Sequence, residues 1–110
     1  MTLPDLDEKA SSILTAFTEL SREKLSDDLV MMKLFGSRAR GEKHEWADMD
    51  ILVVLKDYAR KSEVFDLLFS LDPDWDYRIS PVILSLYEYE KNREIDSPFF
   101  KELERDGISL

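Results

Sequence analysis

The chain has 110 residues, of which 44% are apolar, and a formal net charge of -9. It contains no cysteine and a single histidine, which excludes a disulfide framework, a thiolate metal site and a multi-histidine zinc site. The acidic balance argues against direct binding to nucleic acid, because neutralising phosphates requires a basic surface.

These totals set three further expectations. The length suits a single domain over residues 1–110. The sequence has no apolar run long enough to span a membrane, and its amino terminus lacks the basic-then-apolar order of a signal peptide, so we expect a cytoplasmic protein without a membrane partner. Any bound metal would take oxygen ligands, which indicates Mg²⁺ or a similar hard cation.

The first half of the chain predicts one helix and two strands. From Leu6 onward, apolar residues recur at spacings of three and four, which predicts an amphipathic helix of roughly 20 residues that ends near "SDD". The segment "LVMMKLF", residues 29–35, predicts a buried strand that runs into a turn at Gly36. The segment "DILVVL", residues 50–55, is rich in β-branched residues and predicts a second strand.

The second half predicts a helix, a turn, a strand and two short helices. These elements cover residues 62–71, 72–76, 77–86, 86–92 and 97–107. Pro81 indicates an edge position or a bulge in the strand. Ser97 is a typical N-cap with Pro98 at the first helical position, and Gly107 would end that helix. The element order predicts an α/β fold, with a small mixed β-sheet and helices packed against it.

The turn after the first strand contains Gly36 and Ser37. Glycine lets the backbone approach a ligand closely, and if a short helix begins at Ser37, its free N–H groups would favour an anion such as phosphate. The pair is not a Walker A loop, which needs more glycines and a lysine before the hydroxyl residue. The alternative is an ordinary tight turn, in which glycine is common.

Two aspartates precede the second strand. On an extended chain Asp48 and Asp50 point to the same side with Cα atoms about 7 Å apart, so both carboxylates can converge on one cation or on a pair about 4 Å apart. The alternative is a polar turn. The combination with Gly36 and Ser37 favours function, because a phosphate-binding turn that faces a divalent-metal site suits a nucleoside triphosphate.

The motif "GSRARG", then six residues, then "DMDILVVL", resembles the minimal nucleotidyltransferases of the superfamily related to DNA polymerase β. The likeness is closest over about residues 29–56 and extends to the rest in element order, so it implies a polymerase β-like nucleotidyltransferase fold. It implies that Gly36 and Ser37 bind the phosphates of ATP or another nucleoside triphosphate. It also implies that Asp48 and Asp50 hold one or two Mg²⁺ ions and carry the catalysis.

Arginines of the same turn extend this interpretation. Arg40, with or without Arg38, would stabilise the departing pyrophosphate. A solvated loop charge is the alternative for each of them.

One departure from the family concerns the third predicted strand. Active members usually carry a third carboxylate there, which helps to bind the catalytic metal and acts as general base. In this sequence the position falls at Arg78 or Ser80, and neither replaces a carboxylate. Asp76 has the same side-chain parity, so a shifted register or a bulge would bring it in. Nucleotide and metal binding is therefore better supported than turnover.

The resemblance also implies a protein partner. Larger relatives append a helical domain that holds the acceptor, so a second molecule would have to complete this chain. Stand-alone minimal members are commonly antitoxins of a small all-helical HEPN toxin, an RNase, which some of them silence by adenylylating a tyrosine. Formation of a homo-oligomer is left open. Candidate contact residues for a partner, with burial in the core as the alternative, are Trp46, Tyr87, Tyr89, Phe99 and Phe100. His44 lies in the loop between the two halves of the motif and would be exposed to solvent or contact the substrate.

Two functions compete on this reasoning. The favoured one is a Mg²⁺-dependent enzyme that transfers an adenylyl group from ATP to a protein hydroxyl and acts as an antitoxin. The alternative is a catalytically impaired member of the same fold that neutralises a partner by contact alone. Adenylylation of an aminoglycoside or another small molecule is disfavoured, because an acceptor domain is missing.

Overall fold

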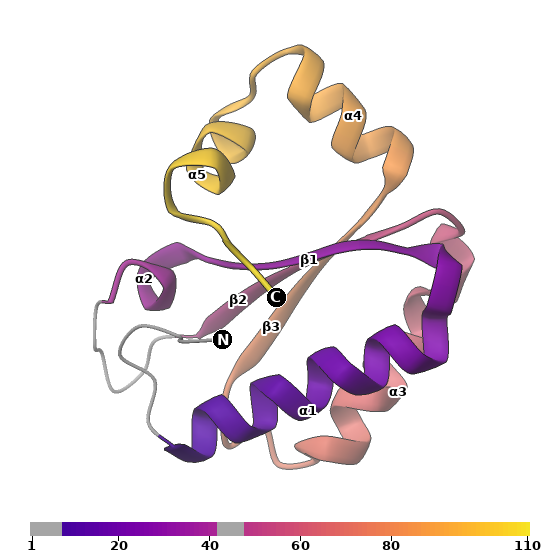
Figure 1. The fold of residues 1–110 in the computed structure, drawn as a ribbon, viewed down its shortest axis with the longest axis vertical. Coiled ribbons are helices and arrows are strands. Elements are labelled where there is room, and N and C mark those ends of the chain that lie inside the picture. The colour runs from indigo at the N-terminus through magenta and orange to yellow at the C-terminus, as the bar shows by residue number, and fades with distance from the viewer. Residues whose placement is uncertain (1–7, 42–47) are drawn as a thin grey trace.

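The computed structural model describes residues 8–41 and 48–110, which build a mixed β-sheet flanked by helices (Figure 1). Within these residues the sheet has four strands in the order β3-β2-β1-β4. Strand β1 pairs antiparallel with β2 and β4, whereas β2 and β3 run parallel. The strands are β1 (Leu29–Phe35), β2 (Met49–Leu55), β3 (Ile79–Ser85) and β4 (Ile108–Ser109). The predicted α/β fold with a small mixed sheet is confirmed.

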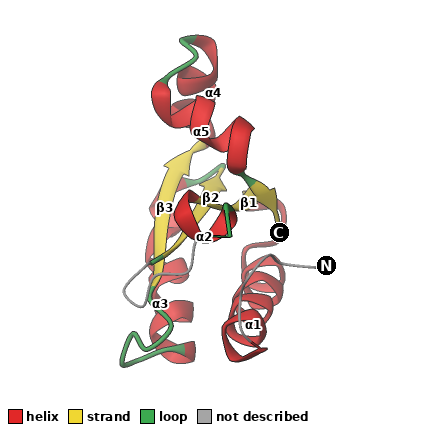
Figure 2. Cartoon of the chain, turned by 90° about the vertical axis from the view of Figure 1, so that its left-hand side faces the viewer, coloured by secondary structure: helices red, strands yellow, loops and turns green. Residues whose placement is uncertain are grey.

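Helices cover both faces of the sheet, as Figures 1 and 2 show from two directions. Helices α1 (Glu8–Leu25) and α3 (Lys61–Leu71) pack on one face. Helices α4 (Leu86–Glu94) and α5 (Pro98–Asp106) pack on the other. In the described part of the chain, no helix combines the length and the apolar character needed to cross a bilayer.

The central strand β2 separates two apolar cores. Met49, Ile51, Val53 and Leu55 face α1 and α3, and all four are fully buried. The alternate residues Leu52 and Val54 pack with Tyr89 of α4 and Leu103 of α5. Because side chains alternate along a strand, Asp50 lies on the same face as Leu52, toward α4 and α5. The polar side of the candidate site therefore opens on that face.

Local sequence signals fix the ends of the carboxy-terminal helices. The Ser85 hydroxyl accepts a hydrogen bond from the Glu88 N–H, and the Glu88 carboxylate accepts one from the Ser85 N–H, which forms a capping box before α4. The Ser97 hydroxyl accepts a hydrogen bond of 3.0 Å from the Phe100 N–H and caps α5, whose first residue is Pro98. The predicted serine cap and the end of α5 at Gly107 are both confirmed.

The described elements follow the predicted order closely. Strand β1 has the predicted bounds, β3 lies at an edge of the sheet as Pro81 indicated, and α1 ends in a 3₁₀ turn over Ser26–Asp28. Three short elements were not predicted as such. They are α2 (Gly36–Ala39), for which the sequence offered only a conditional helix start, a 3₁₀ turn over Tyr58–Arg60, and β4. Strand β4 is two residues long and depends on pairing with β1, so no local sequence pattern predicts it.

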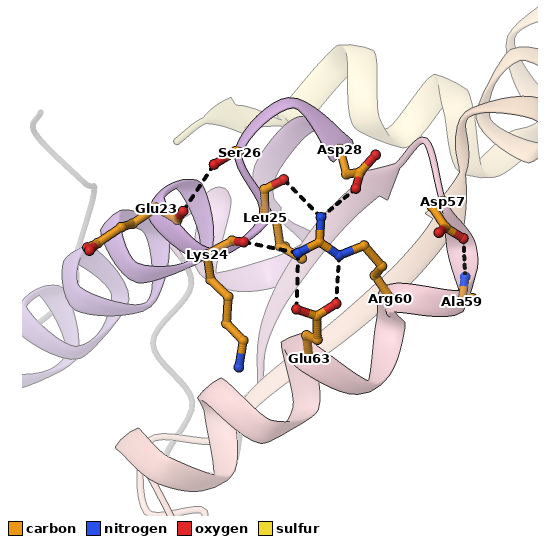
Figure 3. Close-up of polar contacts among 9 residues, drawn as sticks. All are labelled: Glu23, Lys24, Leu25, Ser26, Asp28, Asp57, Ala59, Arg60 and Glu63. Carbon is orange, nitrogen blue, oxygen red and sulfur yellow. Dashed lines mark hydrogen bonds and ion pairs between the residues drawn. The ribbon is translucent and has the colours of Figure 1, made fainter.

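At the end of the β1–β2 pair where β1 begins, one arginine connects several segments by hydrogen bonds (Figure 3). Arg60 donates to both oxygens of Glu63, from Nε at 2.6 Å and from Nη2 at 3.0 Å. Its Nη1 also bonds the carboxylate of Asp28, and Nη2 donates to the carbonyl of Lys24 at 3.0 Å. The guanidinium thus links the end of α1, the start of β1 and the first turn of α3.

Candidate functional site

The candidate site begins where β1 ends beside the start of β2. Phe35, the last residue of β1, is paired with Asp50, so Gly36 lies directly next to that aspartate. Gly36 has a φ of +76°, and a Cβ added there would come within 2.4 Å of Asp50 Oδ2. A side chain at this position would collide with the carboxylate and would also strain the backbone. The close approach explains why glycine stands at this point of the motif.

Helix α2 starts at Gly36 and ends at Ala39. The Arg40 N–H donates to the Gly36 carbonyl at 3.3 Å and closes this single turn. The first N–H groups of such a turn have no carbonyl partner within the helix. Ser37 is half-buried in the turn, one residue beyond the glycine that touches Asp50. Gly36 and Ser37 are thus brought to the same corner as Asp50.

Asp50 lies in an electrostatically unfavourable place. Its pKa is raised above the usual aspartate range, first by burial, then by the negative charge of Asp48 and then by that of Glu102. Glu102 lies on α5, far from the motif in sequence, and it was not singled out from the sequence. In the sequence Glu102 is one acidic residue among others on a predicted helix. Nothing in that pattern predicts that the helix packs against β1. Negative charges that gather around a half-buried carboxylate favour binding of a cation.

Asp48 faces an arginine instead of another carboxylate. Arg78 donates to Asp48 Oδ1 from Nε at 3.0 Å and approaches the same oxygen with Nη2 at 3.0 Å. The Met49 N–H also donates to the Arg78 carbonyl at 2.8 Å, so the backbone holds the two segments together. The Arg78 guanidinium lies 4.4 Å from the centre of the Trp75 ring, which supports it on one side.

The register of β2 and β3 decides which residue takes the position of the third carboxylate. Asp50 is paired with Ser80, and Val82 and Leu84 of β3 continue on the face toward α4 and α5. Ser80 therefore stands across from Asp50. The shift or bulge that would have brought in Asp76 does not occur, because β3 begins only at Ile79.

Asp76 belongs to a turn that the buried carboxylate of Asp72 organises. The Asp72 oxygens accept hydrogen bonds from the Asp76 N–H at 2.8 Å and from the Tyr77 N–H at 3.0 Å. Arg78 then has a φ of +54°, which breaks the alternation assumed for an extended segment. The parity argument for Asp76 was wrong for this reason.

Arg40 points to α5 in this structure. Its Nη1 donates to Asp106 Oδ2 at 3.2 Å and lies 3.7 Å from Glu102 Oε1. Asp106 is held by Arg105 as well, at 2.8 Å from Nη2. Arg40 is one residue past α2 and close to the site, but its guanidinium contacts carboxylates of the protein itself.

The donor set fits a divalent cation only in part. Asp48 and Asp50 lie close enough for their charges to interact, and the backbone of Gly36 lies against the Asp50 carboxylate. Among the described residues no group of three or more carboxylate, histidine or cysteine side chains is arranged to hold a metal ion. Two carboxylates with further ligands from water and a nucleotide are a usual arrangement for Mg²⁺. The residues therefore fit a cation that is completed by its substrate.

An apolar cavity of about 430 Å³ opens at the free edge of β3. It lies between the second half of α3, the turn after it and the start of β3, and Ser80 forms part of its wall. Phe65 is half exposed here. The lining residues are Phe65, Leu68, Phe69, Asp72, Pro73, Trp75, Ile79, Ser80 and Pro81.

The aromatic residues considered as partner contacts divide into two groups. Tyr89 is buried, and Phe99 and Phe100 pack against the core beneath α4 and α5. Tyr87 is 69% exposed and stays a candidate contact. His44 and Trp46 lie outside the described residues.

Comparison with known proteins agrees with this geometry. Residues 14–107 match the family described as "Nucleotidyltransferase domain". The "Putative protein adenylyltransferase MJ1305" of Methanocaldococcus jannaschii is 35% identical over 85 residues, which cover 72% of this chain. MJ0141 of the same organism has the same description and is 32% identical over 89 residues, which cover 78% of this chain and 83% of that protein. The chain spans 58% of the length of MJ1305.

A solved structure supports the fold independently. A doubly substituted form of the toxin–antitoxin complex MntA–HpeT matches with a TM-score of 0.53 at 17% identity, over 94% of this chain and 72% of that one. At this identity the likeness concerns the fold alone. Proteins with this domain generally use a nucleoside triphosphate and a divalent metal ion. On the family match and the identity to MJ1305 together, this chain belongs to the nucleotidyltransferase domain family.

Proposed function

We propose that this chain transfers an adenylyl group from ATP to a hydroxyl group of a protein in a Mg²⁺-dependent reaction. The observation that carries the proposal is the contact between Gly36 and the Asp50 carboxylate, with Asp48 close enough to raise the pKa of Asp50. A glycine turn pressed against an acidic pair is suited to hold phosphates and their cation together. The two relatives described as protein adenylyltransferases support the type of reaction.

Each residue of the motif has a role in this proposal. Gly36 and Ser37 bind the phosphates through the first N–H groups of α2 and the serine hydroxyl. Asp48 and Asp50 hold Mg²⁺, which when bound neutralises charge on the phosphates. The acceptor hydroxyl oxygen forms a bond to the α-phosphorus and loses its proton to solvent, while the bond from that phosphorus to the bridging oxygen breaks and pyrophosphate leaves.

Arg40 is the residue proposed to stabilise the departing pyrophosphate. To do so, its guanidinium must exchange Asp106 and Glu102 for phosphate oxygens. Arginine suits both types of partner, because its fork of N–H donors matches carboxylate and phosphate geometry. The exposed position of the Arg40 side chain leaves room for that movement.

The proposed acceptor is a small, all-helical HEPN-type partner, which this chain would silence as a cytoplasmic antitoxin. The structural likeness to a component of a toxin–antitoxin complex is the observation that motivates this choice. The net charge of -9 would favour association with a basic protein. We further propose that residues 1–110 act as a single domain, alone or as a homo-oligomer.

A second candidate function rests on β3. The position across from Asp50 holds Ser80, and Arg78 pairs with Asp48 where active relatives are expected to gather a third carboxylate. A chain without that group would lack a general base and would neutralise its partner by contact alone. The intact Gly36 turn and aspartate pair favour the enzyme, because neither is needed for a contact surface.

A transfer assay distinguishes the two functions. The protein is incubated with Mg²⁺, ATP labelled at the α-phosphate and the protein encoded by the neighbouring gene, and label is followed on that protein. The enzyme hypothesis predicts labelling by the wild type and none by the double variant Asp48→Asn/Asp50→Asn. Both substitutions keep the size of the side chain, so the fold should persist, and circular dichroism would verify it.

Partner inhibition measured in parallel completes the test. If the double variant still silences the partner at full strength, and no label is transferred by the wild type, the contact function replaces the enzyme. Loss of labelling together with loss of silencing supports adenylyl transfer.

A further inference from the structure

We propose that Arg78 is a built-in cation of the candidate site, which holds Asp48 while no metal ion is bound and so weakens the affinity of the aspartate pair for a divalent metal. The inference rests on the proposed function of Asp48 and Asp50. It adds a residue that sets the affinity of the site for its metal. Nothing in the motif of glycine, serine and aspartates points to this role.

The contact between Arg78 and Asp48 is specific in geometry. Nε and Nη2 of the guanidinium both meet the same oxygen, Oδ1, at 3.0 Å. The two side chains are 32% and 36% exposed, so solvent screens the pair only in part. Charge-assisted hydrogen bonds of this length are among the stronger polar contacts in proteins.

The surroundings hold Arg78 in this place. Its guanidinium rests on Trp75, whose Nε1 donates to the Ile79 carbonyl at 3.0 Å and so fixes the ring. The carboxylate of Asp72 organises the same turn through two backbone N–H groups. Arg78 is also anchored by its own backbone, since its carbonyl accepts from the Met49 N–H. The arginine is therefore positioned before any ligand arrives.

The charges around Asp48 explain what the arginine does. Asp48 lies close enough to Asp50 for the two negative charges to repel, and Glu102 adds a third negative charge near Asp50. Arg78 supplies a positive charge at Asp48 and relieves part of that repulsion. A divalent cation that approaches the pair must then displace Arg78 or accept a neighbouring positive charge.

A nucleotide changes this balance. Its phosphates bring negative charge that a metal ion and an arginine can share, and guanidinium groups bind phosphate as readily as carboxylate. The metal ion would thus bind weakly to the free protein and more firmly together with the nucleotide. Arg78 is a positioning residue in this account, since it acts through Asp48.

Binding of Mn²⁺ in the absence of nucleotide tests the inference, with the free ion measured by electron paramagnetic resonance. We expect Arg78→Ala to bind Mn²⁺ about tenfold more tightly than the wild type, because a nearby positive charge is removed. Arg78→Lys keeps the charge and should stay close to the wild type. The matched control is Arg93→Ala, which removes an equal charge from a pair with Glu90 on α4, beyond the opposite end of β3.

A substitution at Asp48 shows whether the effect passes through that residue. In the Asp48→Asn background, Arg78→Ala should raise Mn²⁺ affinity by much less than it does in the wild type, because the hydrogen-bonded pair is already lost. Thermal melts of every variant establish that each one is folded.

Equal Mn²⁺ affinities for the wild type and Arg78→Ala would overturn the inference and leave the proposed metal site standing. A gain as large in Arg93→Ala would also overturn it, because net charge alone would then explain the effect. If neither the wild type nor Arg78→Ala binds Mn²⁺, with or without ATP, the proposed site itself fails.

Discussion

The two ends of the β1–β2 pair differ in how their charged side chains are paired. At the end where β1 begins, Arg60 bonds the carboxylates of Glu63 and Asp28 and two backbone carbonyls (Figure 3). At the end where β1 stops, Asp50 lies half-buried beside Asp48, and its pKa is raised by burial and by like charge. Charges at the first end satisfy one another. At the second end Asp48 pairs with Arg78, but Asp50 still has the like charges of Asp48 and Glu102 beside it.

The difference separates a structural cluster from a binding site. A satisfied cluster lowers the free energy of the folded protein, so its loss should reduce stability without changing chemistry. Repelling carboxylates that are kept beside a glycine turn raise that free energy and are explained by a ligand that relieves the repulsion. The predictions below test this contrast, beginning with the largest expected effect.

Gly36→Ala should damage the site most. The new Cβ would lie 2.4 Å from Asp50 Oδ2 and would have to displace the carboxylate. We expect the rate of adenylyl transfer to fall about 100-fold, as displacements near 1 Å do in other active sites. The matched control is Gly107→Ala, whose Cβ would meet the Leu103 carbonyl at 2.4 Å, away from the aspartates. If both variants lose stability but transfer equally well, Gly36 has no part in the site.

Ser80→Asp should move β3 toward an active transferase. The new carboxylate would stand across from Asp50, in the position where the third acidic residue is missing. We expect the transfer rate to rise about tenfold, which is less than a well-placed general base contributes. The metal-free protein should become less stable, because a third negative charge is added. The control is Ser109→Asp, which adds the same charge at the exposed residue of β4. An unchanged or lower rate in Ser80→Asp would argue for the contact function instead.

Arg60→Ala should affect stability and leave the chemistry alone. The substitution removes hydrogen bonds that join α1, the start of β1 and α3. We expect Tm to fall by about 5 °C in a scanning calorimeter, with an unchanged rate of transfer at a temperature where both proteins are folded. If the folded variant transferred the adenylyl group much more slowly than the wild type, the Arg60 end would not be a purely structural cluster.

The pH dependence of stability should reveal Asp50. Because the pKa of Asp50 is raised in the folded protein, that state binds its proton more tightly than the unfolded chain does. The resulting stabilisation is complete below the ordinary aspartate pKa of 3.8 and is lost as the pH rises through the folded-state pKa. Asp50→Asn lacks this dependence, so at pH 7 it should melt a few degrees above the wild type. A variant less stable than the wild type at pH 7 would contradict the assigned repulsion.

Much of the fold could be predicted because its signals are local. The bounds of β1, the Ser97 cap and the edge position of β3 follow from apolar runs, a cap residue and one proline. The short strand β4 has no such signal, because it forms only by pairing with β1 across the fold.

The site was predictable in the same limited way. Gly36 and Asp50 could be paired from the motif, and the structure brings them into contact. The approach of Glu102 to Asp50 depends on how α5 packs, and no sequence pattern records it. The sequence marked Arg78 only as a position where the family's third carboxylate is absent. Its bond to Asp48 could not be predicted, because it depends on the parallel pairing of β2 and β3 and on the positive φ of Arg78.

Thermal unfolding with and without Mn²⁺ and ATP tests the central claim most directly, which is that the Asp48–Asp50 end of β2 binds a metal–nucleotide complex. Ligand at about 100 times its Kd should stabilise the wild type by about 2.7 kcal/mol and raise Tm by on the order of 10 °C. The double variant Asp48→Asn/Asp50→Asn should show no increase over its own Tm without ligand. An equal increase in both proteins would contradict the account, because the aspartate pair would then have no part in binding.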